Sequence, residues 1–515
     1  MILSELLRGV SFDYCSASPD DDISGIADDS RSVRPGYMFV AVRGSSEDGH
    51  AYITPALAAG ASCIVAEDIR IIPGDVSAVK VADSRKALIQ LASNFFRIRP
   101  ANMILIGVTG TNGKTTTAYL IESVIASAGF ISGVIGTVNY RYPGKIVRGS
   151  NTTPDPIVLA SLLRDMADTG VTHAVMEVSS HALDQRRVDG CPFRIAVFTN
   201  LSRDHLDYHD SMDSYFKAKT RLFQEFEYAG GLPPYAAINA DDRRGKELIG
   251  MLEKSRRTGV ESGIITFGLS EGCMVRPRSH SIGIEGIRAL ISTPACELEI
   301  ESSLIGRFNL YNILAAVSAC IAGGIDPVSI AAGIRKLKGV PGRLEKVETK
   351  LPAPVLIDYA HSPDALFNVL DTLRPLTSGR IVTVFGCGGD RDKGKRPQMG
   401  AIAARMSDVV VITSDNPRTE EPLSIARRIE EGVVEAGMRP FNLCEPSGTQ
   451  TSFSGSGYMM EIDRAAAIKK ALGIAESGDI VLIAGKGHED YQIIGGVKRH
   501  FDDREAVLAA TGDIK

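Results

Sequence analysis

A seven-residue segment rich in glycine and threonine, Gly110–Thr116, constrains the fold of this chain more than any other segment. The apolar run 103–108 before it predicts a buried strand, and the residues after it place apolar side chains at helical spacing. A glycine loop between a strand and a helix is typical of a phosphate site, because the backbone N–H groups at the helix N-terminus point at the anion. Lys114 adds positive charge, and a threonine hydroxyl can reach Mg²⁺. The segment therefore predicts a nucleotide-binding strand–loop–helix unit.

The spacing of this loop differs from the commonest form of phosphate loop. The pattern G-x-x-x-x-G-K-[ST] requires glycine at position 108, where this chain has Val108. We therefore interpret Gly110–Thr116 as a phosphate loop of another kind than those of motor proteins and GTPases.

The length, net charge and cysteine content of the chain limit the class of protein that it can be. A chain of 515 residues is too long for one core, and about three domains are expected. A net charge of −5 gives no reason to expect nucleic acid as a partner. No apolar stretch approaches the ~20 residues of a membrane span, and the N-terminus lacks a signal-peptide pattern. The eight cysteines lack C-x-x-C pairs and are expected to be reduced thiols, so we expect a cytoplasmic protein. We also expect a monomer.

The order of strand and helix patterns predicts an α/β fold with three domains. Residues 1–98 form a small α/β domain, 99–340 a central parallel-sheet domain with helical crossovers, and 341–515 a doubly wound, Rossmann-like domain. The predicted linkers are a basic stretch at 97–100 and Gly339–Gly342. Strands are expected at 37–42, 62–66, 103–108, 173–178, 194–199, 355–359, 381–385, 409–413 and 480–484, and helices at 51–60, 86–96, 115–128 and 157–168. Residues 446–457 predict a mobile loop.

Four polar clusters of the middle part are candidates for chemistry. The hydroxyls of Asn151–Pro154 either cap the next helix or contact a ligand. Glu177 ends an apolar strand of the sheet that carries the phosphate loop, where a Mg²⁺ ligand is expected. The segment 199–209 is too rich in His and Asp for a core, which favours metal or phosphate binding over a solvated loop. By composition alone, Lys217 and Lys219 indicate the solvated face of a helix.

Four polar loops follow the strands of the last part. They are 358–361, 386–396, 415–418 and 485–490. Ligands of open parallel sheets bind beyond the carboxyl ends of the strands, so the four loops predict one wall of an active site. The arginines in these loops suggest carboxylate ligands, because a guanidinium group binds a carboxylate through two hydrogen bonds.

These motifs, in this order along essentially the whole chain, resemble the Mur ligases, ATP-dependent amide-forming enzymes of cell-wall precursor synthesis. Val108 is normal for the phosphate loop of that family. The resemblance implies that ATP is bound by Gly110, Thr111, Asn112, Gly113, Lys114, Thr115, Thr116, Asn309, Arg343 and Asp358. It assigns the UDP-linked muramoyl-dipeptide substrate, UDP-N-acetylmuramoyl-L-alanyl-D-glutamate, to Ser30, Ser45, Ser46, Glu47, Asn151, Thr152, Thr153, Ser179, Gln185 and Arg187.

The resemblance also implies a metal site and catalytic residues. Mg²⁺ would be bound near Thr115, Glu177, His205 and Lys219, and the catalytic residues would be Lys114, Lys219, His205 and Glu177. Lys219 would be carbamylated by CO₂, which reverses the interpretation from composition, because a carbamate is an anionic oxygen ligand.

The identity of the acceptor amino acid follows from the last loops. The resemblance implies that meso-2,6-diaminopimelate is bound by Arg391, Asp415, Asn416, Pro417, Arg418, Gly485 and Glu489. Diaminopimelate differs from lysine by one distal carboxylate, and Arg418 is suited to pair with it. Lysine-adding relatives lack this arginine motif, which favours diaminopimelate.

The implied reaction is phosphoryl transfer from ATP to the D-glutamyl γ-carboxylate, followed by attack of the amine of diaminopimelate on the acyl phosphate. Alternatives are a lysine-adding Mur ligase, a ligase resembling folylpolyglutamate synthetase, and an ATP-switched binding protein without ligase activity. The first would lack the Asp415–Arg418 motif, the second would not need a uridine-binding domain, and the third would not need the acceptor loops.

Overall fold

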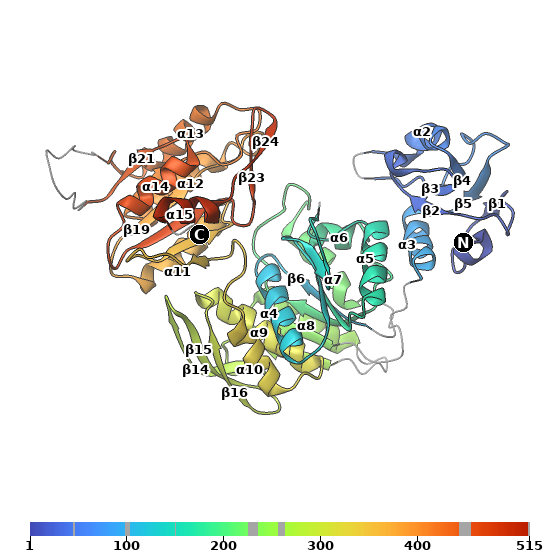
Figure 1. Ribbon diagram of the computed structural model, residues 1–515. Helices are drawn as coiled ribbons and strands as arrows, with labels where there is room; N and C mark the ends of the chain where they lie inside the picture. Colours follow the sequence, from blue (N-terminus) through green and yellow to red (C-terminus); the bar gives the residue numbers. More distant parts are fainter. Residues whose placement is uncertain are drawn as a thin grey trace. The chain divides into compact units, whose positions relative to one another are not determined.

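The computed structural model describes residues 1–44, 47–97, 103–149, 151–224, 235–255, 263–441 and 455–512. The chain divides into two compact units. Figure 1 labels the helices and strands of the structure. The first comprises Met1–Ser279, Ala289–Ile300 and Tyr311–Lys336, and the second comprises His280–Arg288, Glu301–Leu310 and Leu337–Lys515. Within the described residues, no helix combines the length and apolar character needed to cross a membrane. Most of the predicted 97–100 linker and of the predicted 446–457 loop lies outside the described residues.

The N-terminal part of the first unit is built on a five-stranded sheet of order β1-β5-β4-β3-β2. Leu3, Leu6, Met38, Val65 and Leu91 pack in one buried cluster of this part. The strands are β1 (Tyr14–Cys15), β2 (Gly25–Ala27), β3 (Tyr37–Val40), β4 (Ala61–Ala66) and β5 (Ser77–Lys80), and the helices are α1 (Leu3–Leu6), α2 (Ile53–Ala58) and α3 (Ser84–Phe95). The strands predicted at 37–42 and 62–66 are confirmed, and so is the helix predicted at 86–96.

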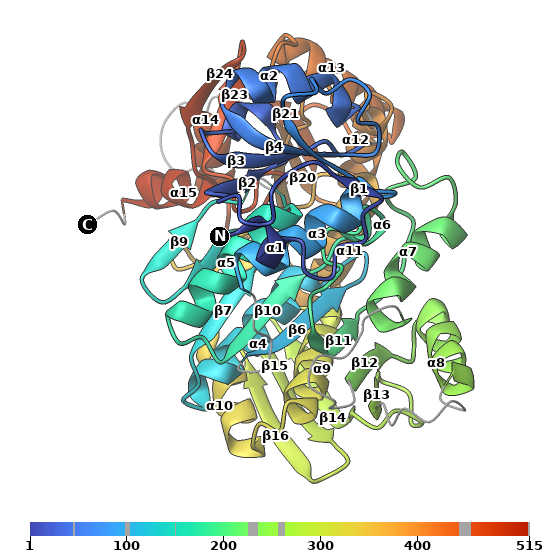
Figure 2. The same ribbon diagram turned by 90° about the vertical axis from the view of Figure 1, so that its right-hand side faces the viewer.

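The central part is built on an eight-stranded sheet of order β13-β12-β11-β6-β10-β7-β8-β9, in which the first six strands are parallel (Figure 2). Its strands are β6 (Ile104–Thr109), β7 (Ser132–Ile135), β8 (Tyr140–Tyr142), β9 (Lys145–Val147), β10 (His173–Glu177), β11 (Phe193–Phe198), β12 (Tyr235–Asn239) and β13 (Gly263–Phe267). The helices are α4 (Lys114–Ser127), α5 (Pro156–Asp168), α6 (Ser180–Asp184), α7 (Met212–Gln224) and α8 (Arg243–Ser255). The predicted parallel sheet with crossover helices is confirmed.

The prediction that strands and helices alternate throughout 101–340 is wrong for residues 276–302. This segment forms a three-stranded sheet of consecutive strands, β14 (Arg276–Gly283), β15 (Gly286–Ser292) and β16 (Glu297–Ser302), followed by α9 (Arg307–Ala322) and α10 (Pro327–Lys336). In β16 exposed and buried residues alternate one by one, the burial pattern of a sheet with one face in water. This two-residue period distinguishes it from a buried parallel strand.

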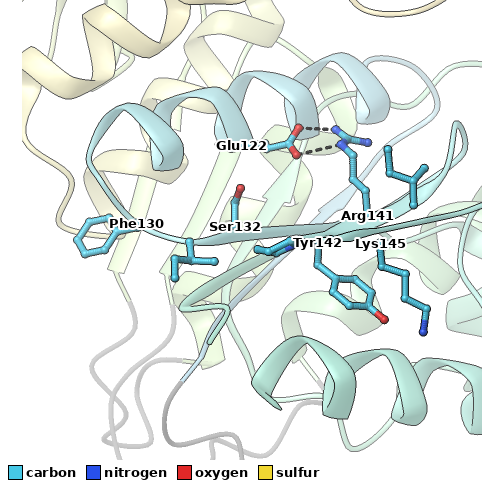
Figure 3. A pocket seen from close by; sticks show the side chains of 10 residues that line it. Glu122, Phe130, Ser132, Arg141, Tyr142 and Lys145 are labelled. Atoms are coloured by element: carbon cyan, nitrogen blue, oxygen red, sulfur yellow. Dashed lines mark hydrogen bonds and ion pairs between the residues drawn. The ribbon is translucent and has the colours of Figure 1, made fainter. Parts of the chain in front are cut away.

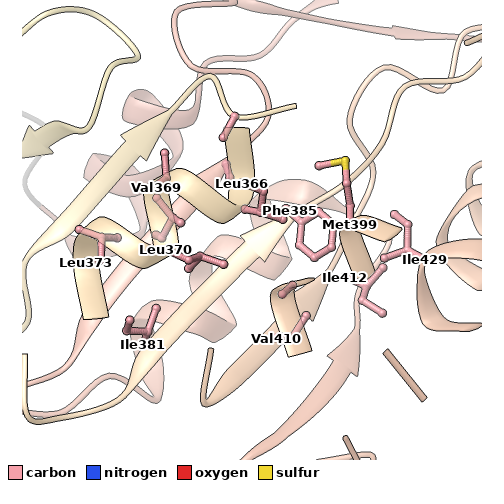
Figure 4. Close-up of a cluster of buried hydrophobic side chains, with 14 of the residues drawn as sticks. Leu366, Val369, Leu370, Leu373, Ile381, Phe385, Met399, Val410, Ile412 and Ile429 are labelled. Carbon is pink, nitrogen blue, oxygen red and sulfur yellow. The ribbon is translucent and has the colours of Figure 1, made fainter. Parts of the chain in front are cut away.

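The C-terminal part of the second unit has a six-stranded sheet of order β17-β18-β22-β19-β20-β21, parallel except for β17. The strands are β17 (Glu345–Val347), β18 (Val355–Asp358), β19 (Ile381–Phe385), β20 (Val409–Ile412), β21 (Gly457–Met460) and β22 (Ile480–Ala484), with a hairpin of β23 (Tyr491–Ile494) and β24 (Val497–His500). The helices are α11 (Pro363–Leu373), α12 (Lys395–Met406), α13 (Pro422–Glu435), α14 (Arg464–Gly473) and α15 (Asp503–Thr511). Leu366, Leu370, Phe385, Met399 and Ile412 pack together in its core (Figure 4). The predicted doubly wound sheet is confirmed.

Candidate active site

The phosphate loop turns on two glycines with positive φ angles. Gly110 has φ 150° and Gly113 has φ 87°, and Gly113 immediately precedes α4. A Cβ atom on Gly110 would lie 1.9 Å from Oγ1 of Thr199, and one on Gly113 would lie 2.2 Å from Oδ1 of Asn312. Nζ of Lys114 donates to the carbonyl oxygens of Gly110 and Thr111, both at 2.8 Å. The loop is therefore closed around the lysine and admits no larger residue at either glycine.

The segment after β11 holds the phosphate loop from the adjacent strand. The N–H of Asn112 donates to Oδ1 of Asn200 over 2.9 Å, and the N–H of Thr111 donates to the carbonyl of Asn200 over 2.9 Å. Oγ1 of Thr199 donates to the carbonyl of Asn112 over 2.6 Å. Thr199 and Asn200 thus fix the shape of the loop.

Glu177 ends β10 and is 1% exposed. Its carboxylate accepts hydrogen bonds from Oγ1 of Thr115 at 2.9 Å, from Oγ1 of Thr137 at 3.0 Å and from the N–H of Thr137 at 2.9 Å. A Cβ atom on Gly136 would lie 2.3 Å from Oε1 of Glu177, so the backbone there approaches the carboxylate as only glycine allows. Thr137 and Gly136 were not predicted, although they follow β7 in the same sheet.

Lys219 is buried, and the interpretation from composition is wrong for it. Its side chain is 1% exposed on α7, whereas Lys217 two residues earlier is exposed. Nζ of Lys219 donates to the carbonyl of Gly110 over 3.0 Å and lies 4.5 Å from the centre of the Tyr215 ring. Burial, with a smaller effect from the nearby Lys114 charge, lowers the pKa of Lys219 well below its ordinary value. The position favours a neutral amine beside the phosphate loop.

His205 lies in a cluster of histidine and tyrosine rings. Its ring centre is 4.9 Å from that of His181 and 5.8 Å from that of Tyr215. Its backbone has φ 54°, and its Nε2 lies 3.6 Å from a carboxylate oxygen of Asp204. Burial lowers the pKa of His205; the Asp204 charge opposes this shift, and the positive charge of the nearby Lys114 adds to it. The neutral imidazole, which is the metal-binding form, is thereby favoured.

The residues assigned to Mg²⁺ fit an oxygen-ligated cation only in part. Glu177 and the Thr115 hydroxyl are in contact and are of the hard oxygen type that Mg²⁺ prefers. Within the described residues, no three His, Cys, Asp or Glu side chains are arranged to hold a metal ion. A carbamate on Lys219 would add a further oxygen ligand from α7.

The polar segment before α5 braces the end of β10. Oγ1 of Thr153 donates to the carbonyl of Glu177 over 2.8 Å and accepts from the N–H of Ser179 over 3.0 Å. The N-cap of α5 is Asp155, which makes no side-chain capping bond, so the hydroxyls do not cap this helix. Oγ1 of Thr152 lies 3.1 Å from Oγ1 of Thr137. The segment therefore belongs to the surroundings of Glu177.

Gln185 and Arg187 lie together beside this segment. Nε and Nη2 of Arg187 both donate to Oε1 of Gln185, at 2.9 and 2.7 Å, and Nη1 donates to the carbonyl of Thr153 over 3.1 Å. Oγ of Ser179 accepts from the N–H of Ala182 and caps α6. Five of the six middle-domain residues predicted for the muramoyl-dipeptide substrate thus form one connected region, and the carbonyl of the sixth, Asn151, accepts from the hydroxyl of Tyr140.

The residues predicted for the uridine end lie in the N-terminal part. Ser30 begins a 3₁₀ turn capped by Asp29, and Glu47 accepts from the hydroxyl of Tyr52 over 2.9 Å. Ser45 and Ser46 lie outside the described residues. The Arg85 side chain links this part to the middle part: its Nη1 donates to the carbonyl of Gln185 over 3.0 Å, and its Nη2 donates to the carbonyl of Arg43 over 2.8 Å.

Asn309, Arg343 and Asp358 belong to the second unit. Nδ2 of Asn309 donates to the carbonyl of Ile305 over 2.8 Å. The buried carboxylate of Asp358 accepts from the N–H groups of Leu344 and Ala360, both at 2.8 Å. Burial raises the pKa of Asp358, and the Arg343 charge opposes this shift. The guanidinium carbon of Arg343 lies 5.0 Å from the centre of the Tyr359 ring.

The four polar loops of the second unit share one edge, as predicted. They follow β18, β22, β19 and β20, which are neighbours in that order in the sheet. Nδ2 of Asn416 donates to Oε2 of Glu489 over 2.8 Å, the N–H of Gly485 donates to the carbonyl of Asp358 over 3.0 Å, and Nη1 of Arg418 donates to the carbonyl of Gly389 over 2.5 Å. We call this set of loops the acceptor rim. Arg391 is exposed on it, and Pro417 is buried.

Lys486 is a residue of the acceptor rim that the sequence did not single out. Its side chain is 0% exposed, and its Nζ lies 3.6 Å from Oδ1 of Asp415 and 3.6 Å from Oε2 of Glu489. Nζ has no hydrogen-bond partner among the described residues. Burial and the Asp415 charge raise the pKa of Glu489, while Lys486 and Asn416 oppose this shift. Two carboxylates and one ammonium group therefore meet inside the rim.

A cavity of about 580 Å³ lies elsewhere, beside the β8–β9 hairpin (Figure 3). Arg141, Glu122 and Phe130 line it, and the Arg141 guanidinium pairs with Glu122 (Figure 3). None of the predicted site residues lines this cavity.

Three domain descriptions of one family match the chain: the Mur ligase family catalytic domain over residues 22–96, the Mur ligase middle domain over 108–320 and the Mur ligase glutamate ligase domain over 342–487. The UDP-N-acetylmuramoyl-L-alanyl-D-glutamate–2,6-diaminopimelate ligase of Geobacter metallireducens is 46% identical over 512 residues, which cover 99% of this chain and 98% of the relative.

Solved structures give the same result. A UDP-N-acetylmuramoyl-L-alanyl-D-glutamate–2,6-diaminopimelate ligase is 33% identical with a TM-score of 0.71, and the match covers 100% of this chain and 99% of that one. A Mycobacterium tuberculosis folylpolyglutamate synthase shares the fold, with 17% identity and a TM-score of 0.60 over 82% of this chain and 95% of its own. This chain belongs to the Mur ligase family.

Proposed function

We propose that this protein is an ATP-dependent ligase that joins meso-2,6-diaminopimelate to the D-glutamyl γ-carboxylate of UDP-N-acetylmuramoyl-L-alanyl-D-glutamate, a step of peptidoglycan precursor synthesis. Relatives that match along almost the whole chain carry the name of this activity. The observation that carries the proposal is the acceptor rim, where the Arg418 guanidinium lies with Asn416 and Glu489 on loops of one sheet edge.

The acceptor rim is suited to an amino acid with two charged ends. Asp415 and Glu489 can receive an ammonium group, and Arg418 can pair with a carboxylate through two hydrogen bonds. The backbone of Arg418 is held by its N–H, which donates to the carbonyl of Ile493 over 2.9 Å. Lysine has no distal carboxylate for this arginine and would leave it unpaired, which disfavours lysine in a desolvated site.

The phosphate loop would bind ATP and direct its γ-phosphate to the donor carboxylate. Gly110–Thr116 would surround the phosphates with N–H groups, and Lys114 would leave its carbonyl partners to neutralise charge on the transferring oxygens. Mg²⁺ bound near Thr115 and Glu177 would polarise the phosphoryl oxygens. The γ-carboxylate would take the phosphoryl group to form an acyl phosphate and ADP, and the amine of the acceptor would then displace phosphate to form the amide.

Each part of the chain would have its own role in this reaction. Residues 1–98 would bind the uridine end, and 99–340, which include Asn309, would bind ATP and the muramoyl dipeptide. Residues 341–515 would bind the acceptor and contribute Arg343 and Asp358 to the nucleotide. We propose that the protein acts in the cytoplasm, where ATP and the nucleotide-linked precursor are available. We also propose that it acts as a monomer.

We propose further that Lys219 is carbamylated. A carbamate forms when a neutral amine attacks CO₂ and loses a proton, and burial favours the neutral amine at this position. The product would be an anionic oxygen ligand near Glu177 and His205, in a region where the ammonium form is disfavoured by Lys114.

The test measures phosphate release from ATP with UDP-N-acetylmuramoyl-L-alanyl-D-glutamate and either diaminopimelate or lysine. We expect release with diaminopimelate and a product that contains all three parts by mass spectrometry. Release with lysine alone would overturn the choice of acceptor, and release with neither would overturn the ligase.

A further inference from the structure

A fully buried ion pair lies behind the acceptor rim. Arg464 is the first residue of α14, and Asp503 is the first residue of α15. Both side chains are 0% exposed. Nε of Arg464 donates to Oδ1 of Asp503 over 2.6 Å, and Nη2 donates to Oδ2 over 2.8 Å. Asp503 thus holds the guanidinium group in one orientation.

The same guanidinium group donates to two loops of the acceptor rim. Nη1 of Arg464 donates to the carbonyl of Ser414 over 3.3 Å, and Nη2 donates to the carbonyl of Ala484 over 3.0 Å. Ser414 directly precedes Asp415, and Ala484 directly precedes Gly485. The two loops follow β20 and β22, which are separated in the sheet by β19. Arg464 therefore joins the ends of two strands that do not pair with each other, in addition to the Asn416–Glu489 hydrogen bond and the backbone hydrogen bond from Arg418 to Ile493 farther along the two segments.

The stability of the core alone does not account for this arrangement. Burying two charges costs desolvation energy, and an apolar pair of similar volume often serves a core as well or better. What an apolar pair cannot do is donate hydrogen bonds to two carbonyl groups at once. A planar guanidinium group with its five N–H donors can, and the bond to Asp503 sets its plane.

We infer that Arg464, oriented by Asp503, is a positioning residue for the acceptor: it fixes the spacing of Asp415 and Glu489 by holding Ser414 and Ala484. Neither residue of the pair is proposed to touch the acceptor. The inference rests on the proposed function, because it assumes that the rim binds the incoming amino acid. Small displacements of binding groups reduce catalysis strongly, so the loss of this link affects use of the acceptor.

The decisive variant replaces both charges with apolar side chains, Arg464→Met together with Asp503→Val in the full chain. This change leaves no buried charge unpaired and approximately keeps the volume of the pair, which protects folding. A matched control is Arg380→Met with Asp479→Asn. Arg380 and Asp479 are joined by a 2.7 Å contact and directly precede β19 and β22, so they lie at the opposite edge of the same sheet.

We expect the double variant to fold, by circular dichroism and thermal melting, and to show a KM for diaminopimelate raised about tenfold or more, with kcat changed less. Its KM values for ATP and for the UDP-linked substrate are expected to stay within about twofold of wild type. In the control variant, Arg380→Met with Asp479→Asn, the KM values for all three substrates are expected to stay within this range. Arg464→Lys keeps the positive charge but loses the planar set of N–H donors of the guanidinium group. We therefore expect a smaller rise in the KM for diaminopimelate than in the double variant.

An unchanged KM for diaminopimelate in the folded double variant would overturn the inference, and so would equal rises for all three substrates or the same rise in the control. If the double variant does not fold, the Arg464→Lys variant is used to test the inference instead. A KM of this variant for diaminopimelate within about twofold of wild type would overturn the inference. Failure of the wild-type chain to use diaminopimelate would instead overturn the proposed function, which keeps the two outcomes separate.

Discussion

Lys219 and Gly110 are joined by a 3.0 Å hydrogen bond from Nζ to the carbonyl oxygen, which connects α7 to the first glycine of the phosphate loop. Nζ of Lys114 donates to the same carbonyl over 2.8 Å. Two ammonium groups at one carbonyl repel each other, and Lys219 is the buried one. Its environment therefore favours the neutral amine from which a carbamate can form.

Lys219→Met should stabilise the protein and abolish ligase activity. Because the folded-state pKa of Lys219 is below the ordinary value of 10.5, the folded state binds fewer protons than the unfolded state between the two values. In CO₂-free buffer, wild-type stability should therefore rise with pH across that window, and the variant should lose this dependence. We expect about 0.5–2 kcal/mol of added stability at pH 7 by denaturant unfolding. A destabilised or active variant would contradict the assigned role.

Glu177→Gln should keep the fold and lose turnover. The amide can accept from only one oxygen, whereas the carboxylate accepts from Thr115 and from two groups of Thr137. Loss of the charge removes the expected Mg²⁺ interaction, so ATP turnover should fall at least about a hundredfold in a phosphate-release assay. Glu122→Gln, at an ion pair outside the predicted site, is the matched control and should retain turnover. Comparable losses in both variants would argue against a special role of Glu177.

Arg418→Ala should weaken the use of diaminopimelate far more than the binding of ATP. The side chain is the proposed partner of the distal carboxylate, so kcat/KM for diaminopimelate should fall by about 10²–10⁴, with preference over lysine largely lost. ATP affinity, measured by calorimetry, should change little. Arg428→Ala, at a surface pair on α13, serves as the control. Equal losses for ATP and diaminopimelate would refute the assignment.

Lys486→Met should shift the pH dependence of acceptor binding. The Lys486 charge opposes the rise of the Glu489 pKa caused by burial and by Asp415, so its removal raises that pKa further. Glu489 must be ionised to receive an ammonium group, and the acidic limb of 1/KM for diaminopimelate should therefore move to higher pH by about one unit. The pH dependence of 1/KM for ATP should not change. An unshifted profile for diaminopimelate would show that Lys486 does not act through Glu489.

The polar loops were predictable because their position depends on local order along the chain. A short apolar run predicts a parallel strand, and the polar residues directly after it lie at the carboxyl edge of the sheet. Asp415–Arg418 and Gly485–Asp490 were placed on one edge in this way, and the strand order confirms it. The three-stranded sheet at 276–302 was missed, although β16 shows the two-residue period of a strand with one face in water.

The roles of single side chains were less accessible, because they depend on partners far along the chain. Lys217 and Lys219 look alike in the sequence, yet Lys217 is exposed and Lys219 is buried. Lys219 donates a hydrogen bond to the carbonyl of Gly110, which lies 109 positions earlier in the chain. Thr153 resembles a helix cap by position but bonds to the carbonyl of Glu177 instead.

The sequence by itself determined the nucleotide-binding unit at Gly110–Thr116, the succession of α/β parts and the polar edges of their sheets, because glycine geometry and hydrophobic period act over short stretches of chain. Only the tertiary structure decided that Lys219 lies beside Gly110, that Lys486 lies between Asp415 and Glu489, and that Arg464 joins Ser414 to Ala484. Burial and charge pairing arise from residues brought together by folding, and they set the protonation and orientation on which the chemistry depends.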